Sequence, residues 1–326
     1  MGYPRIFGLF VVLSITGMTL TGCSSDSASG VTPASYAGVT TEASITATNS
    51  EDLTEAALDG GAPGDSGLAS ATASQSADRE QLMGMARSLG SAMRGVDMSQ
   101  ASGSQAGIAA VSSNSDTETS ACGGTLSYNF SFDDATGAYS GTFTFSNYVD
   151  CDDKSIINGS LTAEGVLNLS TLVLTSMNMT FTALTYEEGS ESMTLSGTMD
   201  MNSISAFNYT MTMNLDFRDN VKNETYRLEN YVVDITDNIS YIDVDISGTV
   251  YHPTHGYVAV TTTTLIRIYS TDENPTSGVV ELAGSGGSKV VVTFNTNDTY
   301  TMDIDSDGDA TFETTQNCTW STDTCI

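Results

Sequence analysis

The feature that most constrains this fold is an alternation of apolar and polar residues with a period of two, which begins near Cys122 and continues toward the C-terminus. The clearest stretch is residues 207–217, where aromatic, Met and Leu side chains at odd positions alternate with Asn, Thr and Asp at even ones. Successive side chains of a β-strand point to opposite faces of the sheet, so each such stretch buries one face and exposes the other. This pattern predicts strands rather than helices.

Similar stretches follow one another with only short turn sequences between them. Strands connected in this way usually form an antiparallel meander, and a flat sheet of this width would be unusual. We therefore predict an all-β domain, an antiparallel meander of roughly 11–13 strands, rolled into a barrel-like or split-sandwich form. Besides 207–217, the candidate strands lie near residues 127–132, 139–145, 157–169, 171–185, 192–201, 225–236, 240–251, 257–269, 278–283, 288–295, 299–304 and 310–315.

The N-terminal third has a different composition. Residues 23–77 are rich in Ser, Thr, Ala and Gly and poor in large apolar residues, which predicts a disordered tether. Residues 78–96 place apolar side chains on one helical arc and three arginines on another, which predicts a short amphipathic helix. Its apolar stripe would dock on the β domain, or its arginines would contact anionic lipid or a partner protein. Residues 97–121 are predicted to be a polar linker before a β domain spanning 122–326.

Residues 1–22 have the organisation of an export signal. A single positive charge at Arg5 precedes an apolar run that ends in Leu20-Thr21-Gly22-Cys23. This segment resembles the signal and lipobox of bacterial lipoproteins. The resemblance implies cleavage before Cys23 and lipidation of its sulfur and amino group, with Ser24 favouring the outer membrane. An ordinary secreted protein with a disulfide cysteine at this position is the alternative.

The remaining cysteines form an even set, which in an exported protein indicates two disulfides. Three connectivities are allowed, and short loop closure favours Cys122–Cys151 with Cys318–Cys325. A zinc site is the competing interpretation, although the chain has no CxxC pair.

An acidic motif near the C-terminus indicates a calcium site. Acids at alternate positions followed by Gly308 resemble the first half of an EF-hand loop, because Ca²⁺ prefers oxygen ligands and the glycine permits a sharp turn. Position 12 of that loop would be Thr314 rather than Glu, so a plain acidic turn is the alternative. The candidate ligands are Asp303, Asp305, Asp307, Asp309 and Glu313.

Methionines gather on neighbouring candidate strands. They occupy odd positions, so we expect them to share one sheet face, either as a flexible core, as the lining of an apolar ligand cavity, or as ligands for Cu(I). The members considered for an apolar ligand face are Met177, Met179, Met199, Met201, Met211 and Met213.

Charge and motif content narrow the function. Ten basic against 40 acidic residues give a formal net charge of −30, which argues against nucleic-acid binding. The two histidines, His252 and His255, lie in one turn without an evident third ligand, and no common catalytic motif is present. We predict a non-enzymatic binding or structural lipoprotein of the cell envelope, with an unknown partner. The alternative is a carrier of an apolar or lipid ligand in a Met-rich half-barrel covered by helix 78–96.

Overall fold

The computed structural model describes residues 31–59, 111–151, 154–170, 173–205, 208–238, 240–269, 271–272, 274–296, 298–320 and 324–325. These residues form one 15-stranded sheet in which every strand pairs with its neighbours in the sequence. All the pairings are antiparallel, and β1 and β15 lie at opposite ends of the strand order. The sheet is therefore an open meander, which confirms the predicted all-β class.

The strands are long, most having between nine and 16 residues. Their bounds are β1 Val111–Thr119, β2 Thr125–Asp133, β3 Ala138–Val149, β4 Ile156–Asn168, β5 Val173–Glu188, β6 Glu191–Ser205, β7 Asn208–Asp219, β8 Glu224–Asp237, β9 Tyr241–His252, β10 Gly256–Tyr269, β11 Ser277–Ala283, β12 Lys289–Thr296, β13 Thr299–Asp305, β14 Thr314–Thr319 and β15 Thr324–Cys325. The described residues also contain one α-helix, α1 Ser50–Asp59.

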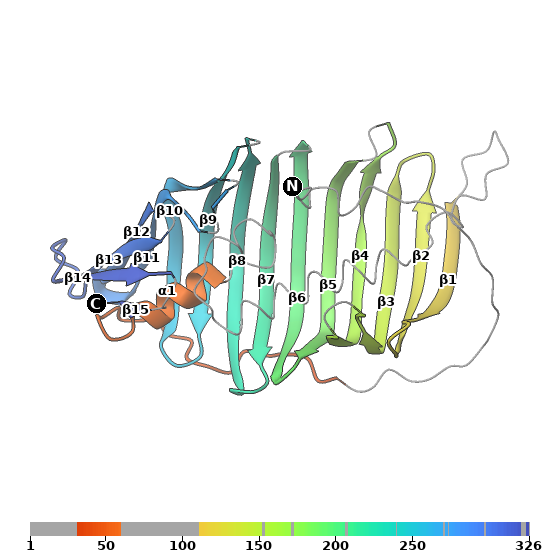
Figure 1. Ribbon diagram of the computed structural model, residues 1–326, viewed down its shortest axis with the longest axis horizontal. Coiled ribbons are helices and arrows are strands. Elements are labelled where there is room, and N and C mark those ends of the chain that lie inside the picture. Colours follow the sequence, from red (N-terminus) through yellow and green to blue (C-terminus); the bar gives the residue numbers. More distant parts are fainter. Residues whose placement is uncertain are drawn as a thin grey trace.

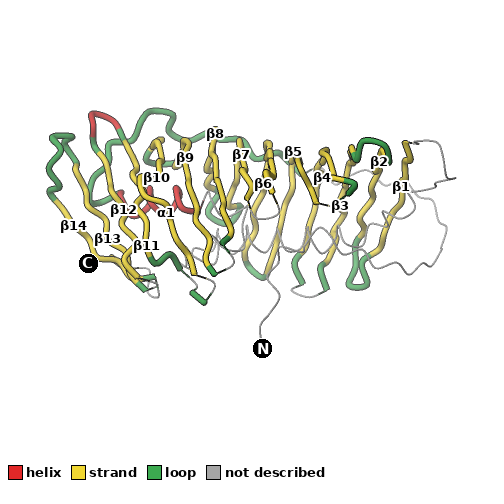
Figure 2. Tube along the Cα trace, turned by 90° about the horizontal axis from the view of Figure 1, so that it is seen from above, coloured by secondary structure: helices red, strands yellow, loops and turns green. Residues whose placement is uncertain are grey.

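The sheet changes direction along its length. From β1 to β9 the strands stand side by side in chain order, whereas β11–β15 turn away from them beside α1 (Figure 1). The view from above shows the same row of strands ending at the C-terminal strands (Figure 2). Curling of this kind is expected, because a twisted sheet this wide cannot stay flat.

The period-two alternation separates the two faces of the sheet. In β7, Met211, Met213, Leu215 and Phe217 are buried, while the polar residues between them are partly or fully exposed. Most of the buried apolar side chains of β2–β14 join in a single core cluster. We call the side carrying this cluster the apolar face and the other side the polar face.

Two strand boundaries differ from those predicted. β1 occupies residues 111–119 of the predicted linker, so the sheet begins before residue 122. Its polar sequence lacks alternation, but its backbone pairs with β2 in continuous register. The predicted strand at 310–315 is also wrong, because the strand that pairs with β13 is β14, from Thr314 to Thr319. Residues 306–313 form the connecting loop, and Phe312 is exposed.

Residues 31–59, here called the clasp, pass from the polar face to the apolar face of the sheet across the turn between β9 and β10. On the polar face, Ala34 N donates to Ser196 Oγ at 2.9 Å and Tyr36 N donates to Asp216 Oδ2 at 3.0 Å. The Tyr36 ring lies 5.2 Å from the Arg227 guanidinium. The clasp therefore starts on the polar side of β6–β8.

The clasp then crosses the β9–β10 turn and reaches the apolar face. Backbone hydrogen bonds join Val39 to Pro253 and Ala43 to Tyr257 during this crossing. Gly256 has a φ of 95°, and a side chain there would meet the Thr41 carbonyl, so glycine is required for the close approach. Finally α1 packs into the core, where Tyr231 Oη donates to the Ala57 carbonyl at 2.6 Å.

This arrangement corrects the predicted tether at 23–77, which is wrong for residues 31–59. This segment has few large apolar residues, but most of them pack against the sheet. They occupy buried positions, with Ile45 and Leu53 at most 1% exposed, and alanines let α1 approach the sheet closely. Residues 23–30 and 60–77 lie outside the described residues, as do residues 78–96, where the amphipathic helix is predicted.

Both predicted disulfides are present. Cys122 and Cys151 join the β1–β2 connection to the segment after β3, across 29 residues. Cys318 and Cys325 are directly opposite each other on β14 and β15. The local connectivity is therefore confirmed.

Candidate functional site

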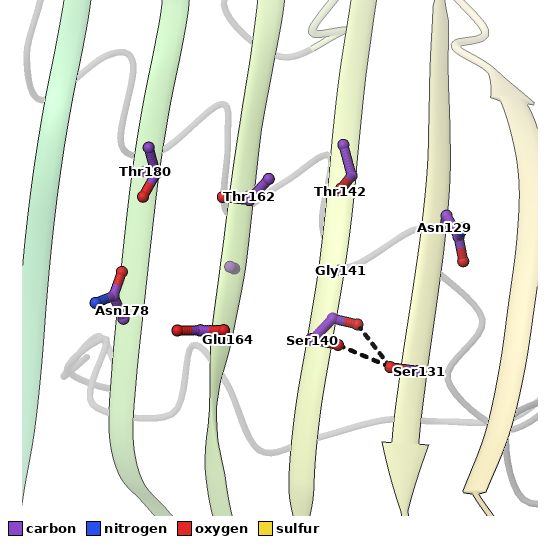
Figure 3. A pocket seen from close by; sticks show the side chains of 10 residues that line it. Asn129, Ser131, Ser140, Gly141, Thr142, Thr162, Glu164, Asn178 and Thr180 are labelled. Atoms are coloured by element: carbon purple, nitrogen blue, oxygen red, sulfur yellow. Dashed lines mark hydrogen bonds between the residues drawn. The ribbon is translucent and has the colours of Figure 1, made fainter.

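A hollow of about 490 Å³ opens on the polar face of β2–β5. Figure 3 shows its polar side chains rising from these four strands. We call it the polar hollow, and it is lined by Asn129, Ser131, Ser140, Gly141, Thr142, Thr162, Ala163, Glu164, Asn178 and Thr180.

The strand register places the polar side chains of the hollow in two parallel rows that cross the strands. One row runs Asn129, Thr142, Thr162 and Thr180, each residue directly opposite the next on the neighbouring strand. The other row runs Ser131, Ser140, Glu164 and Asn178 in the same manner. Neighbouring strands lie about 4.8 Å apart, so each row presents hydrogen-bonding groups at that spacing.

Part of this polar surface is already hydrogen-bonded. The Ser131 and Ser140 hydroxyls lie 2.8 Å apart, and Asn178 Nδ2 donates to Asp200 Oδ1 at 2.5 Å. Five further lining side chains have no hydrogen bond or ion pair to any other described residue: Asn129, Thr142, Thr162, Glu164 and Thr180. The polar hollow thus has unused hydrogen-bonding capacity.

The acidic loop between β13 and β14 is a second candidate site. Carboxylate oxygens of Asp305, Asp307, Asp309 and Glu313 all lie within 4.8 Å of one another. Asp305 is buried, and its two oxygens accept from Gly308 N at 2.8 Å and Ala310 N at 2.9 Å. These donors hold the buried carboxylate in the centre of the loop.

One of the five predicted ligands, Asp303, is not part of this group. Asp303 lies on β13 opposite Thr315, whose hydroxyl donates to its Oδ1 at 2.5 Å. It is not one of the four carboxylates that converge. The grouping thus starts at Asp305, two residues later than an EF-hand alignment places the first ligand. Glu313 closes it and also accepts from Ser306 N at 2.7 Å.

A third cluster was not predicted, because its members are 200 residues apart in the sequence. Asp52 of α1 meets the two histidines of the β9–β10 turn, with its Oδ2 2.9 Å from His255 Nε2. The rings of His252 and His255 stack with centroids 4.5 Å apart. No local sequence signal links Asp52 to this turn. The third member of the cluster can therefore be identified only from the fold.

The hydrogen bonds of His252 favour a structural role over metal binding. Its Nδ1 accepts from Thr254 N at 3.1 Å, so the neutral ring carries its proton on Nε2. A ring that binds metal through Nε2 would need the proton on Nδ1, where it would face that donor. The ring also packs perpendicular to the Tyr226 ring, with centroids 5.3 Å apart. His252 therefore acts as a neutral acceptor that fixes the turn.

We predict that acid destabilises the protein through His252. Burial, with a smaller contribution from His255, lowers the pKa of His252 to about 4. The unfolded chain binds this proton near pH 6.5 and the folded chain only near 4, so stability falls as pH decreases between these values, by roughly 2–4 kcal/mol. Urea unfolding of the wild type and His252→Gln at pH 7 and pH 4.5 measures the difference. An equal loss of stability in both proteins would contradict the assignment.

The methionines share the apolar face, as predicted. Met179, Met199 and Met213 are directly opposite one another on β5, β6 and β7, and so are Met177, Met201 and Met211. Met199, Met211 and Met213 are at most 5% exposed and belong to the core cluster. The polar hollow lies on the other face, so these side chains act in packing among the described residues.

Comparisons with known proteins add no assignment, since no family model, curated protein or solved structure matches this chain significantly. In the part of the chain that the structure describes, no helix is long and apolar enough to cross a membrane. The predicted lipidation site, Cys23, lies outside the described residues.

Proposed function

We propose that this protein is a membrane-anchored lipoprotein of the bacterial outer membrane, with a non-enzymatic binding or structural role in which the polar face contacts its partner. The polar hollow is the observation that supports this role best. It combines a concave shape with five side chains that have no hydrogen-bond partner among the described residues. Ligand sites are typically concave and present a few convergent polar groups.

The clasp determines how such an anchor would hold the domain. Among the described residues, Ala34 is the first that is buried, and it lies 11 residues after Cys23. Even a fully extended chain of this length spans at most about 40 Å. Lipidation at Cys23 would therefore keep the sheet near the bilayer, with the clasp entering on the polar face. Two or three acyl chains, unlike one, provide stable anchoring.

Removing the lipid attachment site tests the anchoring. Cys23→Ala should move the protein from the membrane fraction to the soluble fraction when both forms are expressed in a bacterial host and separated by ultracentrifugation. The wild type should remain with the membranes after a high-salt wash, because acyl anchoring does not depend on charge. A Cys23→Ala protein that stays with the membranes would refute the lipid anchor.

Calcium binding at the acidic loop remains part of the proposal. Its donor set fits Ca²⁺, since four carboxylates converge and the two Asp305 oxygens, each accepting one backbone hydrogen bond, retain a second lone pair. Calcium at about ten times a millimolar Kd should stabilise the protein by roughly 1.4 kcal/mol and raise its Tm by about 2–4 °C.

The loop provides a matched control for this effect. Asp307→Asn with Asp309→Asn should abolish the rise in Tm, whereas Asp303→Asn should preserve it, because Asp303 bonds to Thr315 instead. Calorimetry with and without about 10 mM CaCl₂, ten times a millimolar Kd, compares the three proteins. If the Tm of the wild type does not respond to calcium, the proposed calcium site is refuted. If the response is lost in Asp303→Asn, Asp303 is a ligand, as the EF-hand alignment predicts.

A further inference from the structure

We infer that the polar hollow binds an uncharged, hydroxyl-rich carbohydrate chain. This inference rests on the proposed function and specifies the chemical class of the partner. It follows from three properties of the polar hollow: its charge, its hydrogen-bonding groups and its extent across the strands.

The charge of the polar hollow excludes anionic ligands. Glu164 is its only ionisable lining residue, and no Lys, Arg or His lines it. The whole chain carries a formal net charge of −30. A phosphate or sulfate group would meet repulsion without a compensating cation. With a single carboxylate among its lining residues, the polar hollow fits a neutral ligand better than an anionic one.

The lining groups favour a ligand with many hydroxyls. Ser and Thr hydroxyls and Asn amides both donate and accept hydrogen bonds, as sugar hydroxyls do. An apolar ligand would instead remove Thr142, Thr162 and Thr180 from water without giving them partners. Burial of polar groups without partners costs about 1–3 kcal/mol each, so apolar ligands are disfavoured.

The extent of the polar hollow favours a chain over a single sugar. Its two rows cross four strands, with Asn129 at one end and Thr180 at the other. Three strand spacings of about 4.8 Å separate the outer strands, so each row is roughly 14 Å long. The residues between the two rows, Gly141 and Ala163, add no side chain to this face, since Gly141 has none and that of Ala163 is buried in the core cluster. An extended oligosaccharide lying across the strands would contact both rows.

Calorimetric titration of the full-length protein tests this inference. The probes are cellohexaose, maltohexaose and the hexamer of N-acetylglucosamine, with polygalacturonate as the anionic comparison. At least one neutral hexasaccharide should bind and polygalacturonate should not. Thr162→Val should weaken binding about fivefold, the effect of losing roughly one hydrogen bond.

Thr261→Val, at an exposed position of β10 on the same sheet, is the matched control and should leave binding unchanged. Thermal unfolding of both variants establishes that they fold. Failure of all three neutral probes to bind, or equal binding by the wild type and Thr162→Val, would overturn the inference.

A crosslinking experiment distinguishes failure of this inference from failure of the proposed function. A photo-crosslinking amino acid in place of Thr180 is activated in host envelopes, and the adducts are identified by mass spectrometry. Adducts with glycan support the inference. Adducts with protein alone overturn it but leave a binding role for the polar face, whereas absence of any adduct contradicts both.

Discussion

Leu53→Ala should lower the free energy of unfolding by about 2–5 kcal/mol, the range for truncating a buried leucine. Leu53 is 1% exposed, although it lies in a segment whose composition predicts disorder. It packs from α1 into the core cluster together with Ala56, Ala57 and Leu58. Truncation would leave a cavity between the clasp and the sheet. Urea unfolding, followed by the fluorescence of the buried Trp320, measures the loss.

The control for this experiment is Thr48→Ala, because Thr48 is exposed on the segment that precedes α1. Its effect should stay within about 0.5 kcal/mol, as for ordinary surface substitutions. A Leu53→Ala protein as stable as the control would show that the clasp is not part of the cooperative fold, and the predicted tether would then be restored.

Replacing Cys122 and Cys151 together by alanine should destabilise the protein by about 3–4 kcal/mol. This disulfide closes a loop of 29 residues, and loop-closure entropy of the unfolded chain increases with loop length. The pair Cys318 and Cys325 closes only seven residues, so its double replacement should cost less than about 3 kcal/mol.

Urea unfolding of the two double variants provides an internal comparison. The Cys122 and Cys151 variant should be the less stable of the two. The reverse order would show that entropy of the unfolded chain does not dominate, and that local contacts near β14 and β15 matter more than loop length.

The sequence predicted the sheet well because alternation is a local property. The stretch at 207–217 corresponds to β7, and its odd residues from Met211 to Phe217 are buried as expected. The methionine face was predictable for the same reason, since residues of equal parity on paired strands share a side. Both disulfides followed from short loop closure.

The clasp could not be predicted in this way. Its buried residues gain their energy from contacts with strands far away in the sequence, such as Tyr36 with Asp216, 180 residues apart, and Ala57 with Tyr231, 174 residues apart. Composition measures only what a segment could bury by itself, and this segment buries its side chains against a preformed sheet. The sequence does not predict β1 for a related reason, since its polar residues lack alternation and it pairs with β2 mainly through the backbone.

The candidate sites show the same division between local and long-range information. Four of the five predicted acidic ligands converge, because they lie close together at the end of β13 and in the loop that follows it. The contact of Asp52 with His255 and the rows of the polar hollow depend on pairing between distant segments, which the sequence does not specify. Alternation predicted a face rich in Thr, Ser and Asn but not the position of the polar hollow on it.

Membrane attachment through Cys23 is the central claim of the proposed function, and mass spectrometry of the N-terminal peptide from protein extracted with detergent tests it most directly. We expect a mature chain that begins at Cys23 and carries a diacylglycerol thioether and an acylated amino group. A chain that begins at any other residue, or an unmodified Cys23, would contradict it.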